Sequence, residues 1–464
     1  MKYFLLFLLF ISSVQAQASG LPMEISRTLA GTGISPNHVG IYVIDVSKKR
    51  PLISWHAASP MSPASTMKLV TTYAALSLLG PAYSWKTEAY VSGKVEKGRL
   101  DGPLFLKGYG DPDFNIERLW LFVRKIRALG LNDIRGVVLD RSYFSVSGDP
   151  GSFDDKPFRP YNVIPDALLA NFEANSIDFV PDGKGVRLDI LPNFQSLAIV
   201  NRLRTVPGPC NDWEEGISEK IESDGKRAKL QLDGTYPQEC GEREDSFALY
   251  DHSEYLYQLF SMLWKESGGK IEGGWRNGEV PQDARLLAAT ASPPLSSIVV
   301  AMNKYSNNVM ARQIFLTLGA MKQVPGTEEA ARLAVKSWLE EKKLFFPELV
   351  LENGSGLSRT ARISPLHLGE LLRDAYNGPL MPAFLSSLPI AGIDGTMKKR
   401  LKDTAVMGRA YIKTGSLEDV RAIAGLVQGR TGKRYVVVCI VNDANATAAK
   451  PFEDLLLDWV ERRG

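Results

Sequence analysis

The sequence, 464 residues long, contains little of what most metal and nucleic-acid sites require. It has only four histidines and three cysteines, and they are scattered without the spacing of a metal site. Lysine and arginine number 55 against 52 acidic residues, a net charge of +3, and no basic run is interleaved with aromatic residues. These absences predict a protein without a metal or other cofactor and without a nucleic-acid partner.

Long apolar runs are also scarce, and the one at the start of the chain is short. A positively charged start leads into the apolar run Tyr3–Ile11, and Val14–Ala16 then supplies small residues. The run is shorter than the ~20 residues that a membrane span needs. We therefore expect residues 1–16 to be a signal peptide, cleaved after Ala16 or, as the next choice, after Ala18. The mature protein is then exported, periplasmic or secreted, with no transmembrane anchor.

The three cysteines differ in their surroundings. Cys439 lies within an apolar run with strand character and is expected to be a buried thiol. Cys210 and Cys240 lie in polar, loop-like sequence, and an exported protein meets oxidising conditions. Cys210 and Cys240 are therefore the natural candidates for a disulfide.

The two ends of the chain have helix and strand patterns that the middle lacks. Two apolar strands are expected near the start, followed by a helix with Ser62 as its N-cap and Gly80 at its end. From about Trp85 to Pro281, short strands and turn clusters dominate. The remaining expected elements are a helical patch at 116–129, helices at 295–318 and 328–342, a hairpin at 429–433 and a final helix at 451–462. The two ends therefore form one α/β domain, interrupted by a long insertion.

Ser65 and Lys68 have a spacing that suits nucleophilic catalysis. On a helix, residues three apart share a face, so the Lys68 amine can reach the Ser65 hydroxyl. A serine needs an adjacent base, and a lysine serves only if burial or another cation lowers its pKa. The same spacing at Ser223 and Lys226 lies in a polar turn without helical periodicity, which predicts a solvated loop. The pair at the start of the first helix is the candidate nucleophile and base.

Two later segments offer polar groups for the same site. Tyr305–Arg312 begins a helical stretch after apolar sequence, and taken alone it could be a capped helix turn. Tyr411–Ser416 has the pattern of a strand that ends in a cation, a hydroxyl and a glycine, and taken alone it could be an ordinary strand edge. In this order and together with Ser65 and Lys68, the segments indicate one kind of catalytic site far more specifically than any one of them does alone.

The three segments resemble the Ser-x-x-Lys, Ser-x-Asn and Lys-Thr-Gly motifs of penicillin-binding proteins and serine β-lactamases. Further stretches are similar to class C low-molecular-weight penicillin-binding proteins, the penicillin-binding protein 4 type of D-alanyl-D-alanine carboxypeptidase/endopeptidase. These stretches are Gly108–Pro112, Asn353–Arg359, Leu388–Gly395 and Lys413–Leu417. The long gap between Ser65 and the second motif also matches a class whose extra domains interrupt the catalytic domain.

The resemblance implies catalytic roles for four side chains. Ser65 forms the acyl-enzyme, and Lys68 takes its proton. Ser306 relays a proton toward the leaving amine, and Asn308 holds Lys68 and the substrate amide. The backbone N–H groups of Ser65 and Ser416 form the oxyanion hole. A rival register, Tyr305-x-Asn307, resembles the motif of class C β-lactamases and keeps Tyr305 as a second candidate for proton transfer.

The resemblance also implies a substrate and its binding residues. Lys413 and Thr414 bind the terminal carboxylate of the substrate, and Gly415 and Ser416 complete the binding strand. The expected substrates are peptidoglycan peptides that end in D-Ala-D-Ala, and β-lactam antibiotics are expected to be covalent inhibitors. The oligomeric state is not predicted.

The fold implied is of the α/β (α+β) class. It consists of a penicillin-binding-protein/β-lactamase-like transpeptidase domain with a long β-rich insertion that forms one or two extra domains. The catalytic domain is expected at 20–84 and 284–464. Inserted domain II is expected at 85–110 and 165–283, and inserted domain III at 111–164.

Three other functions are weighed against this one. A serine β-lactamase would need a group that activates water, and no Glu-x-x-Leu-Asn-like element lies between the first two motifs. A Ser-His-Asp hydrolase lacks support because no Gly-x-Ser-x-Gly elbow occurs. A non-catalytic wall-binding or sensor protein would not need all three motifs intact. The expected activity is thus that of a serine D-Ala-D-Ala carboxypeptidase or endopeptidase.

Overall fold

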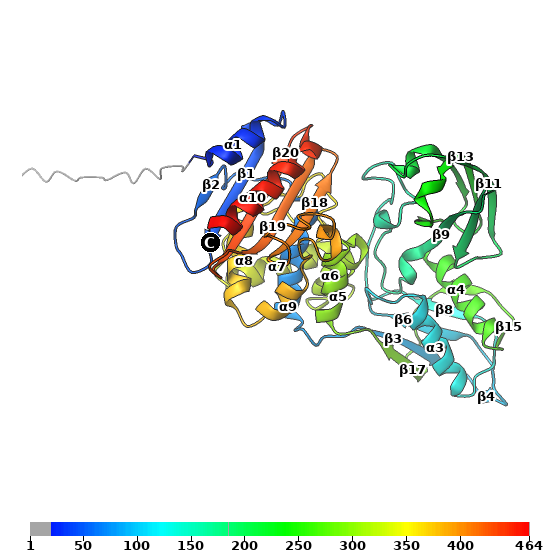
Figure 1. Cartoon of the computed structure of the whole chain (residues 1–464). Helices are drawn as coiled ribbons and strands as arrows, with labels where there is room; N and C mark the ends of the chain where they lie inside the picture. Colours follow the sequence, from blue (N-terminus) through cyan, green and yellow to red (C-terminus); the bar gives the residue numbers. More distant parts are fainter. Residues whose placement is uncertain (1–19, 184, 464) are drawn as a thin grey trace, which may run out of the picture.

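The computed structural model describes residues 20–183 and 185–463 (Figure 1). The expected signal peptide, residues 1–16 with cleavage after Ala16 or Ala18, lies outside the described residues. In the part of the chain that is described, no helix is both long and apolar enough to cross a membrane.

A five-stranded antiparallel sheet from both ends of the chain forms the centre of one lobe, in the order β18-β19-β20-β1-β2. Its strands are β1 (Val39–Asp45), β2 (Ile53–Trp55), β18 (Ala410–Leu417), β19 (Val420–Gln428) and β20 (Arg434–Asn442). All seven residues of β1 are buried, and β20 is buried over most of its length. Strands that are apolar on both faces require cover on both faces of the sheet.

Helices supply this cover (Figure 1). The first face packs against the terminal helices α1 (Met23–Ala30) and α10 (Lys450–Arg463). The second face packs against α8 (Pro365–Asn377), and α2 (Lys68–Leu78) belongs to the same hydrophobic core. The remaining helices of this core are α5 (Leu295–Lys304), α6 (Asn308–Ala320), α7 (Glu328–Glu341) and α9 (Met381–Ser386).

The residues between α2 and α5 form a second lobe with a hydrophobic core of its own (Figure 1). Its five-stranded sheet has the order β16-β8-β6-β3-β17, and its four-stranded sheet has the order β15-β7-β5-β4. Two three-stranded sheets, β10-β9-β14 and β11-β13-β12, complete the lobe with helices α3 and α4.

The elements of the second lobe have the following bounds. The larger sheets contain β3 (Lys86–Val91), β4 (Val95–Glu96), β5 (Arg99–Leu100), β6 (Leu104–Gly108), β7 (Asp133–Ile134), β8 (Val137–Asp140), β15 (Lys270–Ile271), β16 (Trp275–Asn277) and β17 (Arg285–Ala291). The smaller sheets contain β9 (Ala174–Pro181), β10 (Val186–Leu191), β11 (Leu197–Val206), β12 (Ile217–Ser223), β13 (Ala228–Pro237) and β14 (Arg243–Ala248). The helices are α3 (Ile116–Ala128) and α4 (His252–Glu266).

The first helix after β2 departs from the sequence expectation at its start. It begins with a 3-10 turn over Ala64–Met67, and regular α-helix follows only from Lys68. The prediction of Ser62 as its N-cap is wrong, because no side chain caps this turn. The backbone N–H of Ser62 donates instead to Oδ1 of Asn442 over 2.8 Å, which ties the turn to β20.

Candidate active site

Ser65 lies in the 3-10 turn, and Lys68 follows it as the first residue of α2. Side chains three residues apart eclipse one another in 3-10 geometry, more closely than on an α-helix. Nζ of Lys68 accordingly lies 2.9 Å from Oγ of Ser65. The departure from an α-helix at this point therefore brings the hydroxyl and the amine into direct contact.

Lys68 is fully buried among uncharged acceptors. Its ammonium donates to Ser65, to Oδ1 of Asn308 at 2.6 Å and to the backbone oxygen of Ser355 at 2.8 Å. Within the described residues it forms no ion pair. Burial lowers the pKa of Lys68 well below its ordinary value, and the positive charge of Lys413 lowers it further. A neutral amine beside the Ser65 hydroxyl is what a proton acceptor requires.

The second motif lies where the chain passes from α5 into α6. Ser306 has φ 57°, a left-handed conformation that breaks the helical stretch expected over 295–318. Oδ1 of Asn307 caps α6 by accepting from the backbone N–H of Met310 at 2.9 Å. Asn308, the next residue, is the one whose side chain contacts Lys68.

This arrangement separates the two registers of the motif. Asn307 is occupied with the helix cap, and Tyr305 is 79% exposed with no side-chain hydrogen bond within the described part of the chain. Ser306, in contrast, accepts a hydrogen bond from Nζ of Lys413 at 2.9 Å. The geometry favours the register in which Ser306 and Asn308 carry the polar groups.

Lys413 on β18 is the second buried cation of the site. Besides Ser306, it donates to the backbone oxygen of Thr414 at 2.7 Å. Burial lowers the pKa of Lys413 to about 7. The hydroxyl of Thr414 donates to Oγ1 of Thr396 at 2.8 Å, so a loop outside the three motifs positions this side chain.

Gly415 allows β18 to lie directly against the turn that carries Ser65. A Cβ at this position would stand 2.7 Å from the backbone oxygen of Pro63 and 3.0 Å from the backbone nitrogen of Ser65. Any other residue would push the strand away from the nucleophile. The next residue, Ser416, accepts a hydrogen bond at its hydroxyl from Arg421 on β19.

The stretch 353–356 supplies a contact that sequence reasoning missed. Oδ1 of Asn353 accepts from the backbone N–H of Ser355 at 3.0 Å and so anchors the residue whose backbone oxygen receives Lys68. Gly356 has φ 81°, and a Cβ there would lie 1.9 Å from the backbone oxygen of Ala64. The Asn-Gly-Ser-Gly sequence resembles a family motif, but the acceptor is a backbone oxygen, which every residue has, so residue types could not predict its contact with Lys68.

Of the remaining candidates of the sequence analysis, all but Cys439 lie in the second lobe. Cys210 and Cys240 form a disulfide, and Cys439 is a buried free thiol on β20. The Ser223 hydroxyl donates to the backbone oxygen of Leu249 at 2.6 Å. Ser223 and Lys226 make no side-chain contact with each other within the described residues, so this pair lacks the geometry of Ser65 and Lys68.

Known proteins are similar to this chain over most of its length. The D-alanyl-D-alanine carboxypeptidase of Actinomadura sp. (strain R39) is 28% identical over 465 residues, which cover 95% of this chain and 85% of that protein. The crystal structure of penicillin binding protein 4 from Haemophilus influenzae matches with a TM-score of 0.80 at 23% identity, over 95% of this chain and 100% of that one. A structure of the same protein with a novel β-lactam matches with a TM-score of 0.75 at the same identity and coverage.

These structures confirm the expected mixed α/β fold with inserted sheets. The family known as the D-Ala-D-Ala carboxypeptidase 3 (S13) family matches residues 21–463, nearly the whole chain. The chain therefore belongs to the S13 family of serine peptidases and is a D-Ala-D-Ala carboxypeptidase related to penicillin binding protein 4.

Proposed function

We propose that Ser65 is the residue that attacks the D-Ala-D-Ala bond of peptidoglycan stem peptides and that β-lactams acylate the same hydroxyl. The observation that carries this proposal is the contact between the Ser65 hydroxyl and a buried lysine without an acidic partner among the described residues. The sequence has three Ser-x-x-Lys pairs, which begin at Ser65, Ser223 and Ser267. Within the described residues, only Ser65 and Lys68 have this contact.

The proposed reaction begins with proton transfer. Oγ of Ser65 bonds to the carbonyl carbon of the penultimate D-Ala while its proton passes to the neutral amine of Lys68. The carbon–nitrogen bond then breaks, and the leaving amine takes the proton of the Ser306 hydroxyl, which is hydrogen-bonded to Lys413. Ser306 regains a proton from the protonated Lys68, which is then neutral for the next step. Water attacks the resulting ester and gives a proton to Lys68, and Oγ of Ser65 regains its proton as the ester bond breaks.

Substrate recognition is assigned to β18. Lys413 and Thr414 bind the terminal carboxylate of the substrate. Its negative charge pairs with Lys413, which otherwise donates only to uncharged oxygens. A bound carboxylate favours the protonated form of Lys413 and raises its pKa in the complex. Gly415 and Ser416 lie along the same strand, where the backbone N–H groups of Ser416 and Ser65 are proposed to stabilise the oxyanion.

We extend the proposal to endopeptidase action on cross-linked stem peptides. Both reactions break a bond on the same carbonyl carbon and differ only in the amine that leaves. Incubation with purified muropeptides and mass analysis of the products tests both. Loss of one alanine supports carboxypeptidase action, and conversion of dimers to monomers supports endopeptidase action. Rapid, sustained turnover of nitrocefin with no muropeptide product would identify a β-lactamase instead.

The place of action and the domain division are further parts of this proposal. The Cys210–Cys240 disulfide supports action in the periplasm or after secretion, where thiols oxidise. The separate hydrophobic core of the second lobe supports a division into a catalytic domain at 20–84 and 284–464 and an insertion between them. Within the insertion, we keep 85–110 with 165–283 as one unit and 111–164 as another.

A further inference from the structure

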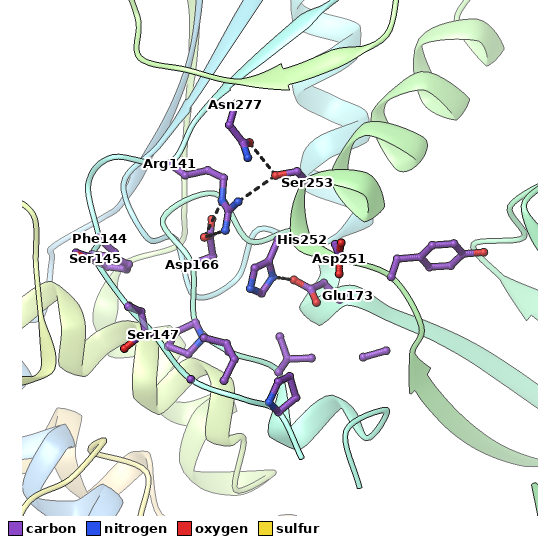
Figure 2. Close-up of a pocket in the computed structure, with 18 of the residues that line it drawn as sticks. Arg141, Phe144, Ser145, Ser147, Asp166, Glu173, Asp251, His252, Ser253 and Asn277 are labelled. Carbon is purple, nitrogen blue, oxygen red and sulfur yellow. Dashed lines mark hydrogen bonds and ion pairs between the residues drawn. The ribbon is translucent and has the colours of Figure 1, made fainter. Parts of the chain in front are cut away.

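A cavity of about 690 Å³ lies in the second lobe, apart from the residues of the three motifs (Figure 2). Its walls come from the chain between Arg141 and Asp166, from Glu173 and the start of α4, and from β16. Pockets that hold small ligands have volumes of roughly 300–1,000 Å³. The cavity therefore has room for a ligand of the size of a disaccharide.

Arg141 and His252, the basic side chains of this cavity, each lie against a carboxylate. Nε of Arg141 donates to Oδ2 of Asp166 at 2.8 Å. Nδ1 of His252 contacts the buried carboxylate of Glu173, and burial lowers the pKa of His252, so its ring is uncharged at neutral pH (Figure 2). Asp251, a further acid at the rim, is exposed to solvent and forms the N-cap of α4. Because Arg141 is paired with Asp166 and the ring of His252 is uncharged, the cavity offers no unpaired cation to an anionic ligand and suits a neutral polar ligand better.

A fixed set of hydrogen-bond donors remains available in the cavity. The Ser253 hydroxyl accepts from Arg141 at 3.1 Å and donates to Oδ1 of Asn277 at 2.8 Å (Figure 2). This orients the Asn277 amide, whose two N–H donors have no partner within the described residues. Nε2 of His252 also has no partner there, and Arg141 uses only part of its donors. Oriented donors of this kind suit a ligand rich in hydroxyl and carbonyl oxygens.

Aromatic side chains line the same cavity. Trp275, Tyr250 and Phe144 are among the lining residues, and because the rings of Tyr250 and Phe144 are buried, the half-buried Trp275 is the ring available to a ligand. The indole of Trp275 is held by a hydrogen bond from Nε1 to Oε2 of Glu254 at 2.9 Å. Sugars combine C–H faces, which stack on aromatic rings, with hydroxyl and acetamide groups at their edges. The available ring and the oriented donors together point to a carbohydrate.

The cavity shares a wall with a pocket that residues of the catalytic lobe also line. Ser147, Gly148 and Ile164 line both the cavity and a neighbouring pocket of about 410 Å³. That pocket is also lined by Ser358 and Arg359, which follow the Ser355 peptide that contacts Lys68. A ligand in the cavity therefore lies one loop away from a pocket whose wall includes Asn353, the residue that anchors Ser355 beside Lys68.

A second contact fixes the cavity wall to the catalytic lobe. The backbone N–H of Asp166 donates to Oε1 of Gln313 at 3.1 Å, and Nε2 of Gln313 donates to the backbone oxygen of Asp166 at 2.8 Å. Gln313 is on α6, the helix that begins with Asn308. The cavity is thus held in a fixed position relative to the residues around Ser65.

We propose that this cavity binds an N-acetylated sugar of the glycan to which the stem peptide is attached. The inference rests on the proposed function, which makes that peptide the substrate. The sugar comes either from the disaccharide linked to the bound peptide or from a neighbouring glycan strand. Both sources present the same acetamide and hydroxyl groups to Asn277, Arg141 and His252.

The test compares two substrates that differ only in the sugar. One is a free pentapeptide that ends in D-Ala-D-Ala, and the other is the same peptide linked to its N-acetylated disaccharide. Asn277→Ala removes two donors from the cavity, and Arg276→Ala, at the neighbouring position on β16 that does not line the cavity, is the matched control. We expect Asn277→Ala to lower kcat/KM for the sugar-linked peptide about 5- to 10-fold, the range for one or two neutral hydrogen bonds.

The free pentapeptide and penicillin acylation should be unchanged in both variants, which shows that Ser65 is intact. A titration of the wild type with the free disaccharide, followed by calorimetry, does not depend on the folding of any variant. Binding together with a preference for the sugar-linked peptide assigns the cavity to the substrate's own sugar. Binding without that preference assigns it to a neighbouring strand.

Absence of both binding and preference overturns the inference. An equal loss for both substrates and for penicillin in Asn277→Ala overturns it as well, because the residue then has a structural role. Either result leaves the proposed function in place as long as penicillin labels Ser65 in the wild type. Failure of that labelling would count against the proposed function itself.

Discussion

The active site and the cavity of the second lobe both contain basic side chains shielded from solvent, but only those in the cavity have a carboxylate partner. In the cavity, the cation Arg141 has a carboxylate partner in Asp166. Lys68 and Lys413 in the active site have none within the described residues, and each donates only to uncharged oxygens. A buried cation with a partner keeps its charge, whereas one without a partner loses affinity for its proton.

The comparison shows how one chain separates recognition from proton transfer. Paired charges in the cavity serve as fixed hydrogen-bonding groups. The unpaired lysines are held where a proton can leave at moderate pH, as the lowered pKa values of both indicate. The following predictions test this contrast, beginning with the largest effect.

Replacing the nucleophile should have the largest effect. Ser65→Ala should abolish covalent labelling by a fluorescent penicillin, because no hydroxyl remains beside Lys68. Ser223→Ala, which changes another serine with a lysine three residues on, should be labelled like the wild type. Gel fluorescence and intact-protein mass give the result. Labelling that survives Ser65→Ala but disappears in Ser223→Ala would refute the assignment.

The second prediction concerns Lys68→Arg. Arginine keeps the charge and approximate length, but it cannot lose its proton at ordinary pH. We expect the variant to fold and to acylate about 10³-fold more slowly, the range for loss of a general base. Stopped-flow acylation measures the rate, and circular dichroism checks the fold. Near-normal acylation would mean that Lys68 acts only as a fixed charge, with Tyr305 or Ser306 the next candidates for the base.

The third prediction concerns recognition by Lys413. Lys413→Met should lower acylation by penicillin and by D-Ala-D-Ala peptides about 10- to 100-fold, the loss expected for one hydrogen bond to a charged group. Amidation of the substrate C-terminus should reduce turnover by the wild type in the same way. Equal cleavage of the amidated and free-acid peptides would contradict binding of the terminal carboxylate by Lys413.

The fourth prediction sets the stability of the two regions against each other. The pKa of Lys413 in the folded state, about 7, lies below its unfolded value, so the charged lysine disfavours folding at low pH. Lys413→Met should therefore raise the free energy of unfolding by about 1–3 kcal/mol at pH 6, with the gain shrinking as pH rises from about 7 toward 10.5.

Arg141→Met should do the opposite, because it leaves the carboxylate of Asp166 without its partner. We expect a loss of about 2–4 kcal/mol near neutral pH. Urea unfolding of both variants at several pH values measures the two effects. A pH-independent loss of stability in Lys413→Met would contradict the inference that charged, unpaired Lys413 lowers the free energy of unfolding.

Sequence reasoning could reach the active site because its residues lie in short motifs. Ser65 and Lys68 are three residues apart, and the fixed spacing alone predicted their contact, although the 3-10 turn that produces it was expected to be a regular α-helix. The break at Ser306 was not placed within the helical stretch expected over 295–318, although Asn307, which follows it, is of a residue type that favours helix N-caps.

The cavity could not be predicted from the sequence. Its partners Arg141 and Asp166 or Glu173 and His252 are each separated by stretches of sheet and loop, and no local pattern marks them. The helix α4, which carries His252, was itself absent from the sequence expectation. Pairing across long gaps depends on sheet topology, which propensity and periodicity do not specify.

The most direct test of the account is the pH dependence of Ser65 acylation by penicillin, measured in the wild type and in Lys413→Met. The account predicts that the wild-type rate rises through the pKa of Lys68 and falls again as Lys413 loses its proton. In Lys413→Met the rising limb should move to higher pH, because the charge of Lys413 lowers the pKa of Lys68. An acylation rate that is flat from about pH 5 to about pH 9 in both proteins would contradict a neutral Lys68 as the base.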